Sequence, residues 1–390
     1  MNFPSFGDAA TYDRLGAKCA AALTGGEGLP FTECYDPLRP LGIIAYYTLP
    51  HLFSADPVVR VYMALAGNLI FFALIHRSLT GLLCGDRAGT ALRALESAFF
   101  VILLANFLPH LPVTLSDLPS LAVFMLAAGQ WRRDEGHARP AGSRRWVYFG
   151  MGLLVAVATL LKQNYIVAGT VLALGAVLFE KTSKRRHKVC YLLFFALGAS
   201  PVLAQFASVY LHSGEFWLYE TEVVRRFFSH VGDRPNVEAF FHSLPKQGAF
   251  MIKVAGEIDS VSFVTLKLYR GLFFLEWAVY KGLRGATTEY RVVGLGDLLR
   301  AYGLVGTYLA VTVGTLVRGP RALRLLGLVA LSTAATNAVM WHTEARYYLL
   351  PRIVFSATLV YWAFIALETV LRGRGRADGG LAGATKSRWS

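Results

Sequence analysis

Acids, cations and tyrosines recur at the ends of the apolar segments of this chain, and they could do chemistry together. The opening stretch GDAATYDRLGAK holds an acid and a tyrosine four residues apart. A lysine or arginine near such an acid can bind a phosphate, and an aspartate can accept a proton as a general base. The polar residues expected at one membrane surface are Asp8, Tyr12, Asp13, Asp36, Arg39, His110, Asp117, Lys162, Gln163, Asn164, His342, Glu344, Arg346 and Tyr347. This set favours a site for an anionic substrate that is embedded in a membrane.

The composition indicates an integral membrane protein. Of the 390 residues, 55% are hydrophobic and 16% are charged, whereas soluble domains have about 25% charged residues. The four cysteines are too few for a disulfide scaffold or a CxxC metal site. No G-x-G-x-x-G, P-loop or HExxH pattern is present.

The apolar segments predict an all-α polytopic fold. A spanning helix needs about 20 largely apolar residues. Nine ranges come near this length, and the two closely spaced pairs among them are expected to form tight hairpins. The nine ranges are roughly 58–78, 95–112, 115–131, 146–161, 164–180, 189–210, 300–317, 325–341 and 349–371.

The basic residues predict the orientation of these spans. Clusters of lysine and arginine follow every second span and hold 21 of the 39 basic residues. The alternate short loops hold only Lys162 and Arg346. Because cytoplasmic loops are enriched in lysine and arginine, the clustered loops are expected in the cytoplasm. The net charge of +14 is thereby spread over separate loops, which argues against a nucleic-acid partner.

Five regions follow from this topology. Residues 1–57 form an outer loop with an amphipathic surface helix, 58–210 hold the first six spans, 211–299 form a long outer segment, 300–371 hold the last three spans, and 372–390 form a flexible, basic cytoplasmic tail. Within the long outer segment, residues 261–283 contain four charges, which favours an interfacial helix over a span. An extra pair of spans there would preserve the sidedness. No hydrophobic helix precedes the opening segment, so we expect an upstream first span that this chain lacks, or export of the N-terminus without one.

The ordered motifs GDAATYDRLGAK, DPLRPLGIIAYYTLPHLF, TLSDLPSLAVF, LLKQN and EARYYLLP resemble the GT-C class of membrane glycosyltransferases. The most similar branch contains the protein O-mannosyltransferases and the lipid A aminoarabinose transferases. The resemblance implies a GT-C-like bundle with surface-lying helices in its first outer loop. It also implies an enzyme of the bacterial inner membrane, with its site facing the periplasm and its C-terminus in the cytoplasm. Such enzymes transfer a sugar from a polyprenyl-phosphate donor to a lipid, glycan or protein acceptor.

The resemblance also implies roles for individual residues. Asp8 would be the general base of an inverting transfer, and Asp117 would orient the acceptor or assist Asp8. Lys162 would hold the donor phosphate. The other implied substrate contacts are Tyr12, Arg39, Glu344, Arg346 and Tyr347. Ala9 stands where the family often has a second acid, so no cofactor is implied, although a divalent metal stays open.

Each of these residues also has a purely structural interpretation. Asp8 is then a solvated loop acid, Asp117 a helix N-cap and Lys162 a side chain that snorkels to the interface. Arg346 would pair with Glu344, and Arg39 would anchor a surface helix. Cys19 and Cys34 could form a disulfide in an oxidising compartment.

Three other functions stay open from the sequence. A transporter or flippase for a lipid-linked glycan would place charges near the bilayer midplane, whereas the charges here lie at span ends. A glycan polymerase or ligase would share the same lipid-linked substrate. A non-catalytic paralogue would fit the absence of the second acid at Ala9.

Overall fold

Helices dominate the structure, a computed structural model that describes residues 7–25, 34–36, 39–84, 90–107, 116–135, 141–180, 185–218, 251–254, 260–273, 290–293, 295–339 and 345–386. The α-helices are α1 (Gly7–Leu23), α2 (Leu41–Phe53), α3 (Pro57–Cys84), α4 (Thr90–Phe107), α5 (Asp117–Glu135), α6 (Ala141–Leu161), α7 (Tyr165–Leu178), α8 (Arg185–Ala199), α9 (Leu203–Ser213), α12 (Ser260–Phe273), α14 (Leu295–Arg318), α15 (Arg321–Val339) and α16 (Leu349–Lys386). Two 3-10 helices, η2 (Ser200–Val202) and η3 (Ala345–Tyr348), adjoin α9 and α16.

Four helices in the described part of the chain are long and apolar enough to cross a membrane. They are Pro57–Cys84, Ser143–Leu161, Arg185–Ser213 and Leu349–Val370. This supports the prediction of a helical membrane protein, but it does not confirm nine spans. Each of the nine predicted ranges does overlap a helix. Helix α7 has 14 residues and is therefore about 21 Å long, well short of the about 30 Å hydrocarbon core.

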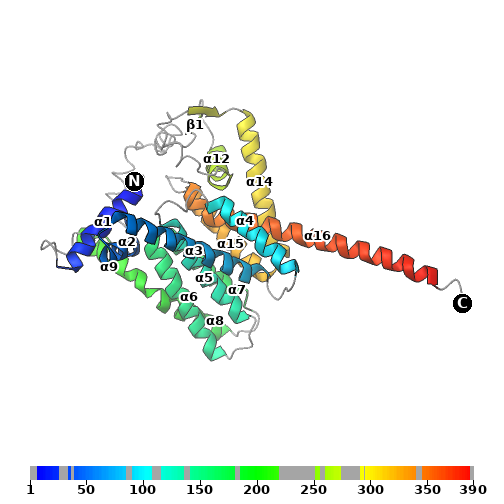
Figure 1. The fold of residues 1–390 in the computed structure, drawn as a ribbon, viewed down its shortest axis with the longest axis horizontal. Helices are drawn as coiled ribbons and strands as arrows, with labels where there is room; N and C mark the ends of the chain where they lie inside the picture. Colours follow the sequence, from blue (N-terminus) through cyan, green and yellow to red (C-terminus); the bar gives the residue numbers. More distant parts are fainter. Residues whose placement is uncertain are drawn as a thin grey trace.

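Most apolar side chains belong to one large core. It is built from α3, α4, α5, α6, α7, α8, α15 and α16. Helices α6 and α8 approach especially closely, because Gly152 and Gly198 each lie directly against the backbone of the other helix. Small residues allow this backbone contact between membrane helices. In Figure 1, α6 and α8 lie side by side below α3 and α5.

The described part of the opening segment is helical. Helices α1 and α2 pack against one another, and they lie at the opposite end of the molecule from the C-terminus (Figure 1). Helix α2 begins directly after Pro40, whose φ of −66° is the value that the proline ring imposes. The described part of residues 1–57 therefore holds two helices before α3, and the assignment of these residues to an outer loop stays a prediction.

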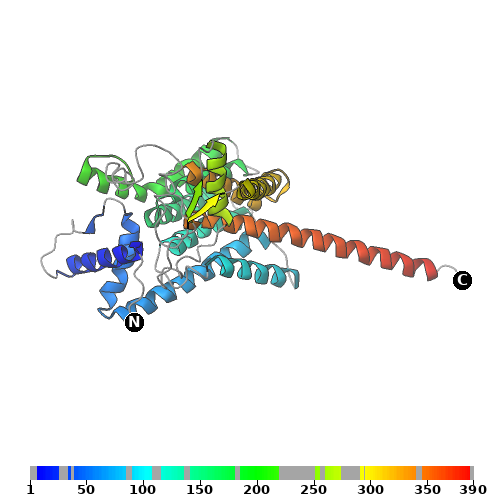
Figure 2. The same cartoon turned by 90° about the horizontal axis from the view of Figure 1, so that it is seen from above.

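The long outer segment and the tail differ from the prediction. Strands β1 (Met251–Val254) and β2 (Tyr290–Val293) form one short parallel pair in a fold that is otherwise helical, as predicted. Helix α12 covers the N-terminal part of the predicted interfacial range. Helix α16 continues to Lys386 and projects beyond the bundle in both views (Figures 1 and 2), whereas a flexible tail was predicted from residue 372. A helix that is already formed adds further residues more easily than a new one starts.

Candidate functional site

Asp117 and Lys162 form a buried ion pair at the expected outer ends of α5 and α6. Lys162 Nζ donates a hydrogen bond to Asp117 Oδ1. Asp117 is 2% exposed and Lys162 is 8% exposed, so Lys162 does not snorkel to solvent. Among the described residues, Asp117 Oδ2 is buried without a hydrogen-bond partner. The sequence predicted each residue as a site residue, and the structure brings the two together.

Tyr347 covers the lysine of this pair. Lys162 Nζ lies 4.4 Å from the centroid of the Tyr347 ring, which is within the range of a cation–π interaction. Asn337 of α15 donates a hydrogen bond from Nδ2 to the Tyr347 carbonyl oxygen at 2.8 Å. This bond fixes η3 against α15, so the ring is held over the ammonium group.

A small pocket opens beside the pair. Its accessible volume is about 10 Å³, which is about the room that one water molecule needs. Its polar walls are an ammonium, an amide and hydroxyl groups. The lining residues are Lys162, Asn164, Tyr165, Ala168, Thr333, Tyr347 and Leu350. A single hydroxyl group or one phosphate oxygen matches such a space, and a whole glycolipid does not.

A second cluster joins Tyr12 and Arg39. The Arg39 guanidinium carbon lies 5.2 Å from the Tyr12 ring centroid, and Arg39 Nη1 donates a hydrogen bond to the Tyr12 hydroxyl at 3.5 Å. Tyr12 also packs on Tyr47 of α2, with ring centroids 5.2 Å apart. Arg39 therefore does not act only as a surface anchor: it ties the start of α2 to α1.

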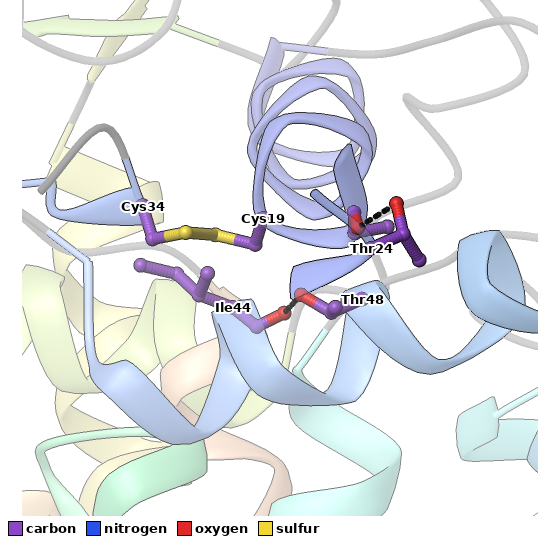
Figure 3. Close-up of a disulfide and its surroundings, with 6 residues drawn as sticks. Cys19, Thr24, Cys34, Ile44 and Thr48 are labelled. Carbon is purple, nitrogen blue, oxygen red and sulfur yellow. Dashed lines mark hydrogen bonds between the residues drawn. A yellow bond between two sulfur atoms is a disulfide. The ribbon is translucent and has the colours of Figure 1, made fainter. Parts of the chain in front are cut away.

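A disulfide between Cys19 and Cys34 closes this cluster. The two Cα atoms are 5.0 Å apart, a normal separation for a disulfide. Figure 3 shows the bond between α1 and the segment that leads into α2, directly above Ile44. The other two cysteines, Cys84 and Cys190, form no disulfide.

The end of α6 connects the two clusters. Leu161, next to Lys162, packs into the same apolar cluster as Tyr12 and Cys19. Gly42 of α2 lies so close to α6 that a Cβ atom there would come within 2.7 Å of the Leu160 carbonyl oxygen. Helix α2 therefore lies directly over the turn that carries Lys162.

Three hydrogen bonds of two glutamines reinforce this layer. Gln205 of α9 accepts a hydrogen bond from the Leu41 backbone N–H at 2.8 Å and donates to the Leu218 carbonyl oxygen at 2.9 Å. Gln163 donates to the same carbonyl oxygen at 2.9 Å. The start of α2, α9 and the turn after α6 are thus held in one arrangement.

Asp13 has a structural partner. His51 Nε2 lies 2.8 Å from Asp13 Oδ1, and Arg60 Nε lies 4.0 Å from the same oxygen. These contacts join α1 to the end of α2 and the start of α3. Asp13 is thereby distinguished from Asp8, which lies on the first turn of α1 with its side chain outside the described part.

Several predicted site residues cannot be placed by their side chains. Arg346 lies in η3, but its side chain falls outside the described residues. Glu344, His110 and His342 lie outside them entirely. Within the described residues, no three His, Cys, Asp or Glu side chains gather as ligands of a metal ion.

The structure adds residues that the sequence reasoning did not single out. Asn337 and Gln205 are buried amides inside apolar helices. A polar group inside an apolar helix must find a partner there, so their position alone was a usable signal. Arg352 of α16 is a further case: it donates a hydrogen bond from Nη2 to the Gly271 carbonyl oxygen of α12 at 2.8 Å.

Helix α12 packs beside the tyrosines of η3. Gly271 lies against the Tyr348 ring, where any larger residue would clash. Lys267 on the same helix is buried, and this burial lowers its pKa from 10.5 to about 8. The interfacial helix thus adjoins the turn that holds Tyr347.

Comparison with protein-family models, with curated proteins and with solved structures found no match to this chain.

Proposed function

We propose that the protein is a membrane glycosyltransferase. It moves a sugar from a polyprenyl-phosphate donor to a lipid, glycan or protein acceptor at the outer face of the membrane. The observation that carries this proposal is the buried Asp117–Lys162 pair beneath Tyr347, at the expected outer ends of several helices. The resemblance of the ordered sequence motifs supplies the reaction class.

Lys162 is the proposed phosphate ligand. An ammonium group has three N–H donors, and one of them is used by Asp117. A phosphate oxygen at the mouth of the adjoining pocket takes another, while Asp117 keeps the ammonium in place. Bonds between charged partners are about twice as strong as neutral ones, so this arrangement favours an anionic leaving group.

Asp8 is the proposed general base. It accepts the proton of the acceptor hydroxyl or amine as that atom attacks the anomeric carbon. The bond from the anomeric carbon to the phosphate oxygen breaks, and polyprenyl phosphate leaves with the electron pair. The sugar is transferred with inversion, because attack and departure occur on opposite faces.

The test is sugar transfer in membranes that contain equal amounts of each variant. The substrate is a radiolabelled pool of polyprenyl-phosphate sugars, and the product is label in the acceptor fraction. We expect Asp8→Asn to lower transfer at least about a hundredfold, the usual contribution of a general base. Lys162→Met should raise the donor concentration needed for half-maximal rate.

Asp13→Asn is the matched control, because Asp13 lies on the same helix and pairs with His51. It should retain most of the activity. Full activity of Asp8→Asn would remove Asp8 as the base, and the search would pass to Asp36 and Asp117. Absence of transfer by the wild type with every donor sugar would contradict the enzyme proposal itself.

A further inference from the structure

A basic and aromatic patch lies at the adjoining N-terminal ends of α6 and α8. It consists of Arg145 and Trp146 of α6 and of Arg185, Arg186, Lys188 and Phe194 of α8. The patch is at the opposite end of α6 from Lys162. It belongs to two of the four helices that are able to cross a membrane.

The two helix ends are held together by stacked rings. Tyr148 of α6 and Tyr191 of α8 are stacked with centroids 4.8 Å apart. Trp146 and Phe194 meet edge to face at 5.4 Å. Together with the close glycine packing of α6 on α8, these contacts make the patch a surface of fixed shape.

Of the two arginines at the start of α6, Arg144 has an acidic partner among the described residues and Arg145 does not. Arg144 forms a largely buried ion pair with Glu180 at the end of α7. Arg145 instead lies over aromatic rings, with its guanidinium carbon 5.4 Å from the Phe194 centroid and 5.8 Å from the Trp146 centroid. Within the described part of the chain, no acid pairs with Arg145, Arg185 or Arg186.

The patch marks the boundary of an apolar surface. Trp146 of α6 is 57% exposed. On α8, Leu193 and Leu197 lie one turn apart and are 63% and 58% exposed. Such leucines on a spanning helix face lipid tails, and an exposed tryptophan beside them marks the level of the headgroups. The arginines of the patch therefore stand at headgroup depth.

We propose that this patch binds the headgroup of an anionic phospholipid. The three exposed arginines supply positive charge for the phosphate, Trp146 packs on the glycerol region, and the leucine surface of α8 takes the acyl chains. Basic residues between neighbouring spans are a known way to hold such headgroups. Charge complementarity selects an anionic lipid over a zwitterionic one, and the site does not depend on the proposed sugar transfer.

The test is lipid binding by the full chain, measured by native mass spectrometry. Purified protein is titrated with phosphatidylglycerol or, separately, with phosphatidylcholine of the same acyl chains. The test variant replaces Arg145, Arg185 and Arg186 with alanine. The matched control replaces Arg77, Arg93 and Arg318, which are equally exposed but lie on three other helices. The two variants lose the same charge.

We expect the wild type to bind phosphatidylglycerol more tightly than phosphatidylcholine, and the test variant to bind it at least about tenfold more weakly. The control variant should bind as the wild type does, and replacement of the three arginines by lysine should restore most of the binding. Equal losses in the test and control variants would overturn the proposal, because binding would then reflect net charge. Equally effective competition by soluble glycerol phosphate would overturn it too, because the ligand would then be a free phosphate.

Discussion

At the scale of single residues, the Asp117–Lys162 pair affects the stability of the protein as well as its proposed binding of phosphate. A buried ion pair contributes little net stability, because desolvation offsets the attraction. Removal of one partner is strongly destabilising, since it leaves an uncompensated buried charge. The pair is therefore expected to be strongly coupled in folding, and the coupling is measurable independently of activity.

We expect Lys162→Met and Asp117→Asn each to lower the midpoint of thermal unfolding in detergent, and Lys162→Met to do so more. The isolated carboxylate left by Lys162→Met should cost about 3–5 kcal/mol. The double variant should be more stable than Lys162→Met alone, while sugar transfer stays low in all three. Additive losses of stability in the double variant would show that the two side chains are not coupled.

Lys267 gives the stability of the protein a specific pH dependence. Its pKa is about 8 in the folded protein against the usual 10.5, because burial disfavours the charged form. Between these two values the unfolded state binds more protons than the folded state does, so the free energy of unfolding rises with pH. Below pH of about 8 both states are protonated, and the contribution is constant.

The measurement is the unfolding midpoint of the wild type and of Lys267→Met at pH 7.0, 8.0, 9.0 and 9.5. We expect the wild type to gain stability relative to the variant from about pH 8 upward. The difference between the two proteins cancels the titration of other groups. A constant difference across this range would contradict a lowered pKa of Lys267.

The residue types predicted which residues belong to the site. They did not predict which residues contact one another. Asp117 and Lys162 were both expected to be functional, but their contact joins positions 45 residues apart, and sequence spacing does not give such distances. Asp117 was also open to interpretation as a helix N-cap, and the structure directs its carboxylate to Lys162. Asn337 and Gln205 were not predicted, because their roles depend on which backbone groups the fold places opposite them.

At the scale of elements, the α1–α2 pair depends on a covalent link. The disulfide joins cysteines 15 residues apart in the sequence, and closing a loop of that length stabilises by about 3 kcal/mol in the chain-entropy model. The remaining contacts include one apolar cluster, the Arg39–Tyr12 interaction and the Asp13–His51 pair. Reduction should therefore loosen α1 before it affects the rest of the bundle.

We expect Cys19→Ser/Cys34→Ser to speed tryptic cleavage after Arg14 and Lys18, which are exposed on α1. About 3 kcal/mol corresponds to about a hundredfold in the opening equilibrium. Cleavage is followed by mass spectrometry of the released peptides. Cys84→Ser/Cys190→Ser is the control and should leave the rate unchanged. Equal rates in the two double variants would show that the disulfide does not hold α1.

Apolarity predicted the helices of the bundle, because that signal is local to each segment. Helix α1 was not located from the sequence for the opposite reason: its apolar run CAAAL is short, and its helix is stabilised by packing on α2. Its alanines and the aspartate in its first turn were nevertheless signals that favour a helix. The strand pair in the long outer segment was not predicted, since β1 and β2 meet across more than 30 residues.

At the scale of the whole molecule, the expected orientation makes the two ends of the bundle chemically different. The end with Lys162 has a paired acid and cation, two surface helices and the disulfide. The end with Arg144 carries the clustered basic residues. Reporter fusions test this sidedness directly.

We expect alkaline phosphatase to be active when fused after residue 163 or 342, and inactive when fused after residue 87, 137 or 182. Green fluorescent protein should give the reverse pattern, because it fluoresces only in the cytoplasm. The physical reason is the retention of lysine- and arginine-rich loops on the cytoplasmic side. An inverted pattern at residues 163 and 182 would place the Lys162 site in the cytoplasm.

The Arg144–Glu180 ion pair also sets how deeply Lys162 sits in the bilayer. Helix α6 rises about 26 Å from Arg144 to Leu161 at 1.5 Å per residue, and the hydrocarbon core is about 30 Å thick. If Arg144 lies at one interface, the Lys162 ammonium lies a few ångströms below the other. A lone ammonium at that depth would oppose membrane insertion of the α6–α7 hairpin, whereas an ammonium with its own carboxylate enters as a neutral unit. Asp117 is thus expected to ease membrane insertion as well as to hold Lys162 in place, and the proposed lipid phosphate would reach Lys162 without leaving the membrane.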